Sequence, residues 1–513
     1  MRRLVRWLAC GAMACWPVAA HAEWQEARTA HFVVYSDDKP AAVSHFAERL
    51  ERFDRLLRHL TNMPTSPTGP ANPVTVYVVD DQSAVASLAG RANVAGFYIP
   101  RAGGSVAFVP RQMVQETANA IGAEAILFHE YTHHFMLSNW ADAAFPAWFV
   151  EGFAEFFGPT RMKPDGSIEI GRPAMYRADA FADGLPVSSA TLLGGNANKS
   201  GVDGIYAQGW LLTHMLVFDA SRKGQLGSYM DAINAGKPML EAAKALGEPR
   251  QLDRDLSAYM RRGMRYSTLP TGMIPDLPVT VRALRPGEVA MMRTQQRSKK
   301  GVTPEQARQM VSAARRAAAP YPNDPAVQVA LAEAEYDAGN YAEAEAAARR
   351  AIAADARSVD GYLYLGMARV GAAQAGKVTD PAQWRDIRKS FLAANGIDND
   401  AAEPLVEFYK SYRAAGTPLT ANTRAALMRA HLLGPQDPDV RMLVAADLLD
   451  QGKAADARKM LGPIAYAPHR DDNAALAATL IATIDKDGGP AALAKWREAT
   501  DQGRKAAKGA GAG

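Results

Sequence analysis

Cysteine is almost absent from this chain of 513 residues, which contains only Cys10 and Cys15. Both lie in an N-terminal segment where three arginines precede an apolar run that ends at Ala22. This pattern is typical of a secretory signal peptide, and we expect cleavage after Ala22. The mature chain would then carry no thiol, which excludes a disulfide framework and any cysteine-based metal site.

Long apolar runs are also missing. The N-terminal run is shorter than the roughly 18 to 20 residues that a membrane-spanning helix needs, and no later segment is continuously apolar. Lipid attachment at Cys15 is disfavoured, because Ala12-Met13-Ala14 lacks the leucine that usually stands three residues before such a cysteine. We therefore expect a periplasmic or secreted protein with no integral membrane span.

The net charge is small. The formal charge of +4 falls to +1 once the three signal-peptide arginines are removed. Nucleic-acid binding gains no support from such a balance.

The chain divides by its periodicity and its prolines. We expect a signal peptide over 1–22, a zincin-like peptidase domain over 23–268, a proline-rich linker over 269–302, helical repeats over 303–500 and a disordered tail over 501–513. Alternating or apolar runs predict a small mixed sheet, and steps of three and four predict helices. The expected strands are 30–36, 74–79, 96–99 and 105–109, and the expected helices are 40–60, 116–137, 146–157, 206–219, 225–234 and 251–262.

The C-terminal part is rich in alanine and repeats itself. Gly339-Asn340-Tyr341-Ala342-Glu343-Ala344 is echoed by Gly452-Lys453-Ala454-Ala455-Asp456-Ala457, and Leu331-Ala332 and Leu365-Gly366 are 34 residues apart. This period resembles the tetratricopeptide repeat, which implies an all-α array of three or four repeats, each a pair of helices, that binds a substrate or a protein partner. The match is irregular around 371–380, where alignment to the period requires an insertion of about nine residues.

A short motif carries the chemistry. His129 and His133 stand four positions apart in His129-Glu130-Tyr131-Thr132-His133, so on a helix both would direct a ring nitrogen at one Zn²⁺. Glu130 is rotated away from both, which suits a general base that activates a zinc-held water and passes its proton to the leaving amine. His134 is turned about 100° from His133 and is expected to pack or to support a ligand.

A second acidic pair follows on an apolar helix, in Pro146-Ala147-Trp148-Phe149-Val150-Glu151-Gly152-Phe153-Ala154-Glu155. A buried carboxylate is costly unless it is paired or binds a metal, so Glu151 is the expected third zinc ligand. Glu155, one turn later, would accept a hydrogen bond from a zinc histidine. The alternative for Glu155 is a surface carboxylate.

Together these two helices resemble the glutamate-zincins, and more narrowly the peptidase MA-like proteins of bacteria, over roughly 24–266. The resemblance implies an α+β zincin-like fold, zinc held by His129, His133 and Glu151, and catalysis by Glu130. Tyr206 stands where such relatives have a tyrosine at the start of a helix, and it would stabilise the oxyanion. The alternative for Tyr206 is packing in the core.

The segment 105–109 is the expected edge strand to which a substrate backbone could add. His214, on an apolar helix face, is expected to be a core histidine, and the basic cluster 297–300 a solvated part of the linker. The leading function is zinc-dependent hydrolysis of peptide bonds. The alternatives are a non-catalytic repeat-based scaffold with a relic zinc site, and zinc chemistry on a non-peptide amide or ester.

Overall fold

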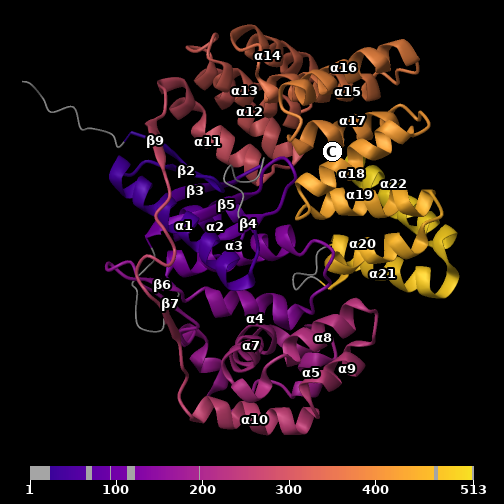
Figure 1. Cartoon of the computed structure of the whole chain (residues 1–513). Coiled ribbons are helices and arrows are strands. Elements are labelled where there is room, and N and C mark those ends of the chain that lie inside the picture. Colours follow the sequence, from indigo (N-terminus) through magenta and orange to yellow (C-terminus); the bar gives the residue numbers. More distant parts are fainter. Residues whose placement is uncertain are drawn as a thin grey trace, which may run out of the picture.

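The computed structural model describes residues 23–64, 72–92, 94–112, 122–195, 197–466 and 472–510. The expected signal peptide lies outside these ranges, as do the first residues expected in the helix 116–137. Figure 1 shows an N-terminal region that combines a sheet with helices, followed by an all-helical C-terminal region. The two regions agree with the coarse expectation of an α+β part followed by helical repeats.

A six-stranded mixed sheet lies at the centre of the N-terminal region. Its strand order is β4-β5-β3-β2-β1-β9, with β2, β3 and β5 mutually parallel and the outer pairs antiparallel. The strands are β1 (Gln25–Arg28), β2 (Phe32–Ser36), β3 (Val74–Asp81), β4 (Phe97–Ile99), β5 (Val106–Gln112) and β9 (Thr280–Ala283).

Successive side chains of β3 are buried in two different cores, one on each face of the sheet. Val76 and Val78 belong to the large core that also contains Phe53 of α1 (Pro40–Thr61) and Phe128 of α3 (Ala123–Asn139). Tyr77 points to the other face, where it shares a smaller core with α2 (Gln82–Ala89) and α11 (Pro286–Lys300). Successive side chains of a strand point to opposite faces, so this apolar strand buries both.

The expected edge strand is wrong. β5 is paired with β3 on one side and with β4 on the other, so the edge of the sheet is β4. The apolar run of β5 belongs to a strand that is buried between neighbours, whereas β4 has only three residues and is weakly marked in the sequence.

The segment 269–302 is not the expected linker, because it contains the strand β9 and the helix α11. β9 adds to β1 at the far edge of the sheet, and α11 covers the sheet face that Tyr77 occupies. The prolines of this segment lie between the elements or at a helix start, as Pro286 does. The basic residues 297–300 therefore end a helix instead of a solvated linker.

In the sequence, a mainly helical region lies between α3 and β9. Its first helix, α4 (Ala147–Phe157), contacts α3, the π-helix η2 (Gly204–Gln208) and α7 (Gly209–Phe218). A small sheet and further helices complete it: β6 (Arg161–Met162), β7 (Ile168–Ile170), β8 (Ser267–Leu269), η1 (Met175–Phe181), α5 (Ser189–Leu193), α6 (Ala197–Asp203), η3 (Ala220–Arg222), α8 (Gln225–Asn234), α9 (Met239–Ala242), η4 (Ala243–Leu246) and α10 (Pro249–Arg261).

The C-terminal region is an array of paired helices, and each helix contacts the next. Gly339 and Gly452 have φ of 78° and 75° at equivalent turns, which explains why the repeated motif begins with glycine. After α12 (Pro304–Ala318), the pairs are α13 (Pro325–Asp337) with α14 (Tyr341–Ala354), α15 (Val359–Ala375) with α16 (Pro381–Ile397), α17 (Ala402–Ala414) with α18 (Ala421–Leu433), α19 (Pro438–Asp450) with α20 (Ala454–Ala465), and α21 (Asp472–Asp487) with α22 (Gly489–Ala510).

The described residues thus form five such pairs, more than the three or four expected. The irregular stretch of the repeat is taken up by lengthening α15 and α16 to 17 residues each. The tail expected to be disordered from 501 is helical to Ala510. None of the helices among the described residues is long and apolar enough to cross a bilayer.

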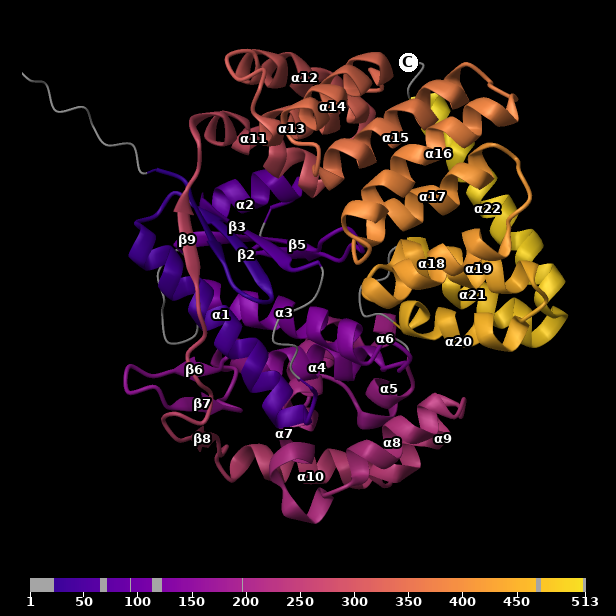
Figure 2. The same ribbon diagram turned by 45° about the horizontal axis from the view of Figure 1, so that its top comes forward.

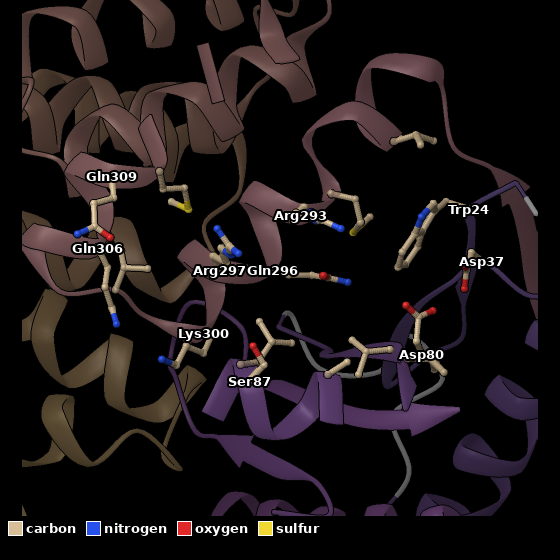
Figure 3. A pocket seen from close by; sticks show the side chains of 18 residues that line it. Trp24, Asp37, Asp80, Ser87, Arg293, Gln296, Arg297, Lys300, Gln306 and Gln309 are labelled. Atoms are coloured by element: carbon tan, nitrogen blue, oxygen red, sulfur yellow. The ribbon is translucent and has the colours of Figure 1, made fainter. Parts of the chain in front are cut away.

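The array lies along the side of the molecule where β4, β5 and α3 are found, as Figures 1 and 2 both show. A cleft of about 780 Å³ lies where the sheet region meets α11 and α12. Figure 3 shows the side chains that line it. Asp37, Asp80 and Trp24 line one part of it, and Arg297 and Lys300 line another.

Candidate metal centre

Helix α3 presents two chemically different faces. Phe128 stacks on Phe53 of α1, with ring centroids 4.0 Å apart, and the Tyr131 hydroxyl donates to Asp54 at 2.7 Å. His129 and His133 lie on another face of the helix and are buried, at 7% and 8% exposure. Phe128 and Tyr131 therefore fix the helix in the core while the histidines remain directed at α4.

Three donor atoms converge between α3 and α4. The Nε2 atoms of His129 and His133 are 3.0 Å apart. Oε2 of Glu151, a fully buried residue of α4, lies 3.2 Å from His129 Nε2 and 3.5 Å from His133 Nε2. The three residues predicted as zinc ligands, 22 residues apart at most in the chain, are thus brought together.

The donor set fits zinc. Tetrahedral zinc with bonds of about 2.0 to 2.1 Å separates its ligand atoms by about 3.4 Å, close to the three distances observed. Two imidazoles and one carboxylate are also a donor combination that zinc accepts in hydrolytic sites, leaving a fourth position open. The residues that would hold the metal are therefore His129, His133 and Glu151.

The charges of the site favour a cation. Burial pushes the pKa of Glu151 upward, but the neighbouring His133 and His129 imidazoles hold it well below its ordinary value. Burial lowers the pKa of His129, but its hydrogen bond to Glu151 and the charge of Glu155 raise it to about 9. In the metal-free site a proton on His129 therefore balances the carboxylates, and zinc would replace it.

Glu155 is placed to support a ligand. It is fully buried on α4, and its Oε1 lies 3.5 Å from Nδ1 of His129, the nitrogen that does not face Glu151. Arg177 of η1 holds the same oxygen with its Nη2 at 2.6 Å and its Nε at 3.2 Å. A carboxylate at this nitrogen orients the imidazole ring. The 3.5 Å contact is an ion pair, and neither Nδ1 of His129 nor Nδ1 of His133 has a hydrogen-bond partner among the described residues.

Glu130 and Tyr206 lie near His129, and both are partly exposed. Glu130 is partly exposed, in contrast to the buried histidine beside it. The ring of Tyr206 is nearly parallel to that of His129, with centroids 6.1 Å apart, and the Arg177 guanidinium lies 4.9 Å from its centroid. Burial and then the charges of Glu151 and Glu130 raise the pKa of Tyr206, so its hydroxyl stays protonated and can donate.

Two glycines allow the helices to meet closely enough for this arrangement. A Cβ on Gly152 of α4 would collide with the backbone of Gly209, and one on Gly209 would collide with the carbonyl of Trp148. Because α4 and α7 touch through their backbones here, Tyr206 comes to lie beside the metal cluster. It is in a short π-helix, not at the start of the expected helix 206–219. Such π-segments are frequent at functional sites.

The neighbouring histidines have other partners. Nδ1 of His134 is 2.6 Å from the Tyr98 hydroxyl, and burial lowers the pKa of His134 to about 3, so its ring is neutral. His214 lies fully buried between Tyr259 and the carbonyl of Gly171, at 2.8 and 2.9 Å. It is the core histidine that was expected.

Sequence reasoning missed Arg177. It follows Glu155 by 22 residues in a segment without periodicity, and only the fold brings it to the site. A lone arginine in such a segment offers no pattern from which its role could be predicted.

A second cluster of His31, Glu51 and Asp54 also has donor atoms close enough for a metal. Its groups already hold one another: His31 Nδ1 is 2.8 Å from Glu51, and Asp54 accepts from Arg58 at 2.7 Å and from Tyr131 at 2.7 Å. A metal here would have to displace a guanidinium and a phenol. This cluster is a buried ion network that anchors α3 to α1.

Comparison with protein-family models finds no match, and comparison with the curated proteins finds none either. Among solved structures, the chain is similar to a thermophilic tetratricopeptide-repeat protein of Thermus thermophilus. The two share 19% sequence identity over 38% of this chain and 97% of that protein, with a TM-score of 0.31.

Proposed function

We propose that this chain is a zinc-dependent peptidase of the glutamate-zincin type. The observation that carries the proposal is the convergence of His129 Nε2, His133 Nε2 and Glu151 Oε2 at 3.0 to 3.5 Å, beside a partly exposed Glu130. The peptidase MA-like resemblance of the two helices points the same way. The repeats would bind a protein substrate or partner.

Zinc, when bound, supplies a Lewis acid that polarises a carbonyl and makes water a stronger nucleophile. Glu130 takes a proton from the attacking water and delivers it to the departing amine nitrogen. Tyr206 keeps its proton and donates a hydrogen bond to the carbonyl oxygen as negative charge develops there. Glu155 and Arg177 keep the His129 ring in one orientation.

The scaffold alternative shares the metal but not the chemistry. A relic zinc site would need the three ligands and would have no use for a carboxylate at position 130, so Glu130 separates the two functions.

The test is cleavage of a broad peptide library by the mature wild-type protein and by Glu130→Gln. We expect Glu130→Gln to keep its zinc and to lose about 10²- to 10⁴-fold in turnover, the usual contribution of a general base. Tyr206→Phe should lose turnover without losing zinc. Bound zinc with no cleavage by any variant would favour the scaffold, and cleavage limited to non-peptide amides or esters would move the chemistry to another substrate class.

A further inference from the structure

The loop between β4 and β5 is inserted into the helical array. Ala102 is buried in the same apolar core as Ala402 and Val440 of the array. Its backbone N–H donates to Asp437 Oδ2 at 2.8 Å. A Cβ on Gly434 would collide with Ala102, so the two regions touch at backbone distance. The helical array thus packs around the loop that connects edge strand β4 to β5.

Gln436 makes the side-chain hydrogen bonds at the centre of this contact. Its side chain is 5% exposed, and its Nε2 donates to the carbonyl of Arg101 at 3.0 Å and to Ser105 Oγ at 3.3 Å. Its Oε1 lies 3.4 Å from Ser138 Oγ, near the end of α3. One amide of the repeat region therefore reaches both the loop and the helix of the metal ligands.

The hydrogen bonds continue from Ser105 to the metal helix. The Tyr98 hydroxyl of β4 donates to Ser105 Oγ at 2.9 Å and lies 2.6 Å from Nδ1 of His134. Nε2 of His134 is 3.4 Å from Ser138 Oγ, which closes a ring back to Gln436. A hydrogen-bond network that joins a loop, a strand and a helix in this way holds these elements in one arrangement.

Two elements of the catalytic region are fixed in this way. His134 directly follows the metal ligand His133 on α3, and β4 is the edge strand of the sheet. β4 also contacts α3. An edge strand has a free row of backbone groups, which an extended peptide can pair with. On the proposed peptidase function, β4 is therefore the strand that would receive the substrate backbone.

We propose that Gln436 of the helical array is a positioning residue for the peptidase site, holding edge strand β4 against helix α3 through Ser105, Tyr98 and His134. The helical array then helps to position the substrate-binding strand, in addition to any binding of partners. This inference rests on the proposed function for its kinetic consequence, but its structural consequence stands without it.

The test uses the full mature chain with Gln436→Met, which keeps the length of the side chain and removes its hydrogen bonds. We expect one zinc per chain as in wild type, a KM for a cleaved peptide raised about 10-fold or more, and a kcat changed much less, because the edge strand is displaced and the chemical groups are not. Gln451→Met is the matched control, since Gln451 is an exposed glutamine whose side chain bonds Asp447 within the array.

Tyr98→Phe cuts the same network from the side of the sheet. We expect its KM effect and that of Gln436→Met to be strongly non-additive in the double variant, because either change already releases β4. Additive effects, or a KM for Gln436→Met equal to that of wild type, would overturn the positioning role while leaving the peptidase proposal intact.

Amide hydrogen exchange of 97–105 provides a readout independent of catalysis. Gln436→Met should speed exchange there, and Gln451→Met should not. If wild type cleaves no peptide but exchange still rises in Gln436→Met, the peptidase function fails and the coupling stands. Unchanged exchange in Gln436→Met would contradict the coupling.

Discussion

Two clusters of histidine and carboxylate lie close to helix α3 of this protein, yet they differ in the charge of their surroundings. His31, Glu51 and Asp54 are met by Arg58 and by the Tyr131 hydroxyl. His129, His133 and Glu151 are met by two further carboxylates, Glu130 and Glu155, and by Arg177. With the histidines neutral, as they would be when they bind a metal, three carboxylates and one guanidinium give the second group a formal charge of −2, which a divalent cation would balance. Proximity of ligand atoms alone does not separate a candidate metal site from a core ion network, and the balance of neighbouring charge is the feature in which these two clusters differ.

The largest expected difference is in zinc binding. His133→Gln removes one of three ligands and should lower zinc affinity by more than the roughly 10- to 100-fold that loss of an outer partner costs. Its matched control is His31→Gln, which should bind zinc as tightly as wild type. Competition against a chelator measures both affinities. A similar loss of zinc in the two variants would remove the distinction between the clusters.

Stability should show the reverse pattern. Asp54→Ala leaves Arg58 and Tyr131 without their shared acceptor in the core and should lower the free energy of unfolding by about 3–5 kcal/mol. Glu151→Ala should destabilise the metal-free chain less, because His129 can release its proton once its carboxylate partner is gone, whereas Arg58 keeps its charge. Urea unfolding of the metal-free proteins measures both. An equal loss of stability would mean that the metal cluster is also a structural network.

Glu155→Gln sharpens the comparison within the metal cluster. It keeps the three ligands and weakens the partner of His129 Nδ1, so we expect zinc affinity to fall by about 10- to 100-fold, less than for His133→Gln. Arg177→Met, which acts only through Glu155 in this respect, should have a smaller effect still. Zinc affinity unchanged in Glu155→Gln would show that this carboxylate does not orient the ligand.

The cluster of His31, Glu51 and Asp54 should make the free energy of unfolding depend on pH in the acid range. Burial pushes the pKa of Glu51 upward, but its contacts with His31 outweigh this and lower it below 4.5. A carboxyl whose pKa is lowered by folding contributes stability above its unfolded pKa, and this is lost as the pH falls through the folded value. Metal-free Glu51→Gln should therefore lose less stability than wild type between about pH 5 and pH 3. Identical slopes in urea unfolding across that range would contradict this.

The parts of the structure that depend on local pattern could be predicted from the sequence. The alternation of Val74 to Val79 marks β3, and the spacing of His129 and His133 on a helix places both on one face. The metal cluster needed one further step, the acidic residue on the next helix. Each of these features involves residues that are close together in the sequence, at most on two successive helices.

The parts that depend on distant contacts could not be predicted. β9 joins the sheet across the whole N-terminal region, where Arg282 bonds Glu26 at 2.7 Å although 256 residues separate them. Gln436 bonds Ser105 across 331 residues. The many prolines in 269–302 led to the prediction of a linker where β9 and α11 lie, because prolines also stand at the ends of strands and helices. No periodicity within a segment encodes its partner elsewhere in the chain.

The most direct test of the central claim is the metal content of the purified mature protein together with its activity. We predict one zinc per chain in wild type and in Glu130→Gln, peptide cleavage by wild type alone, and no bound zinc in His129→Ala/His133→Ala. A wild-type chain that binds no zinc when zinc is supplied, or a double variant that binds it as well as wild type, would contradict the account.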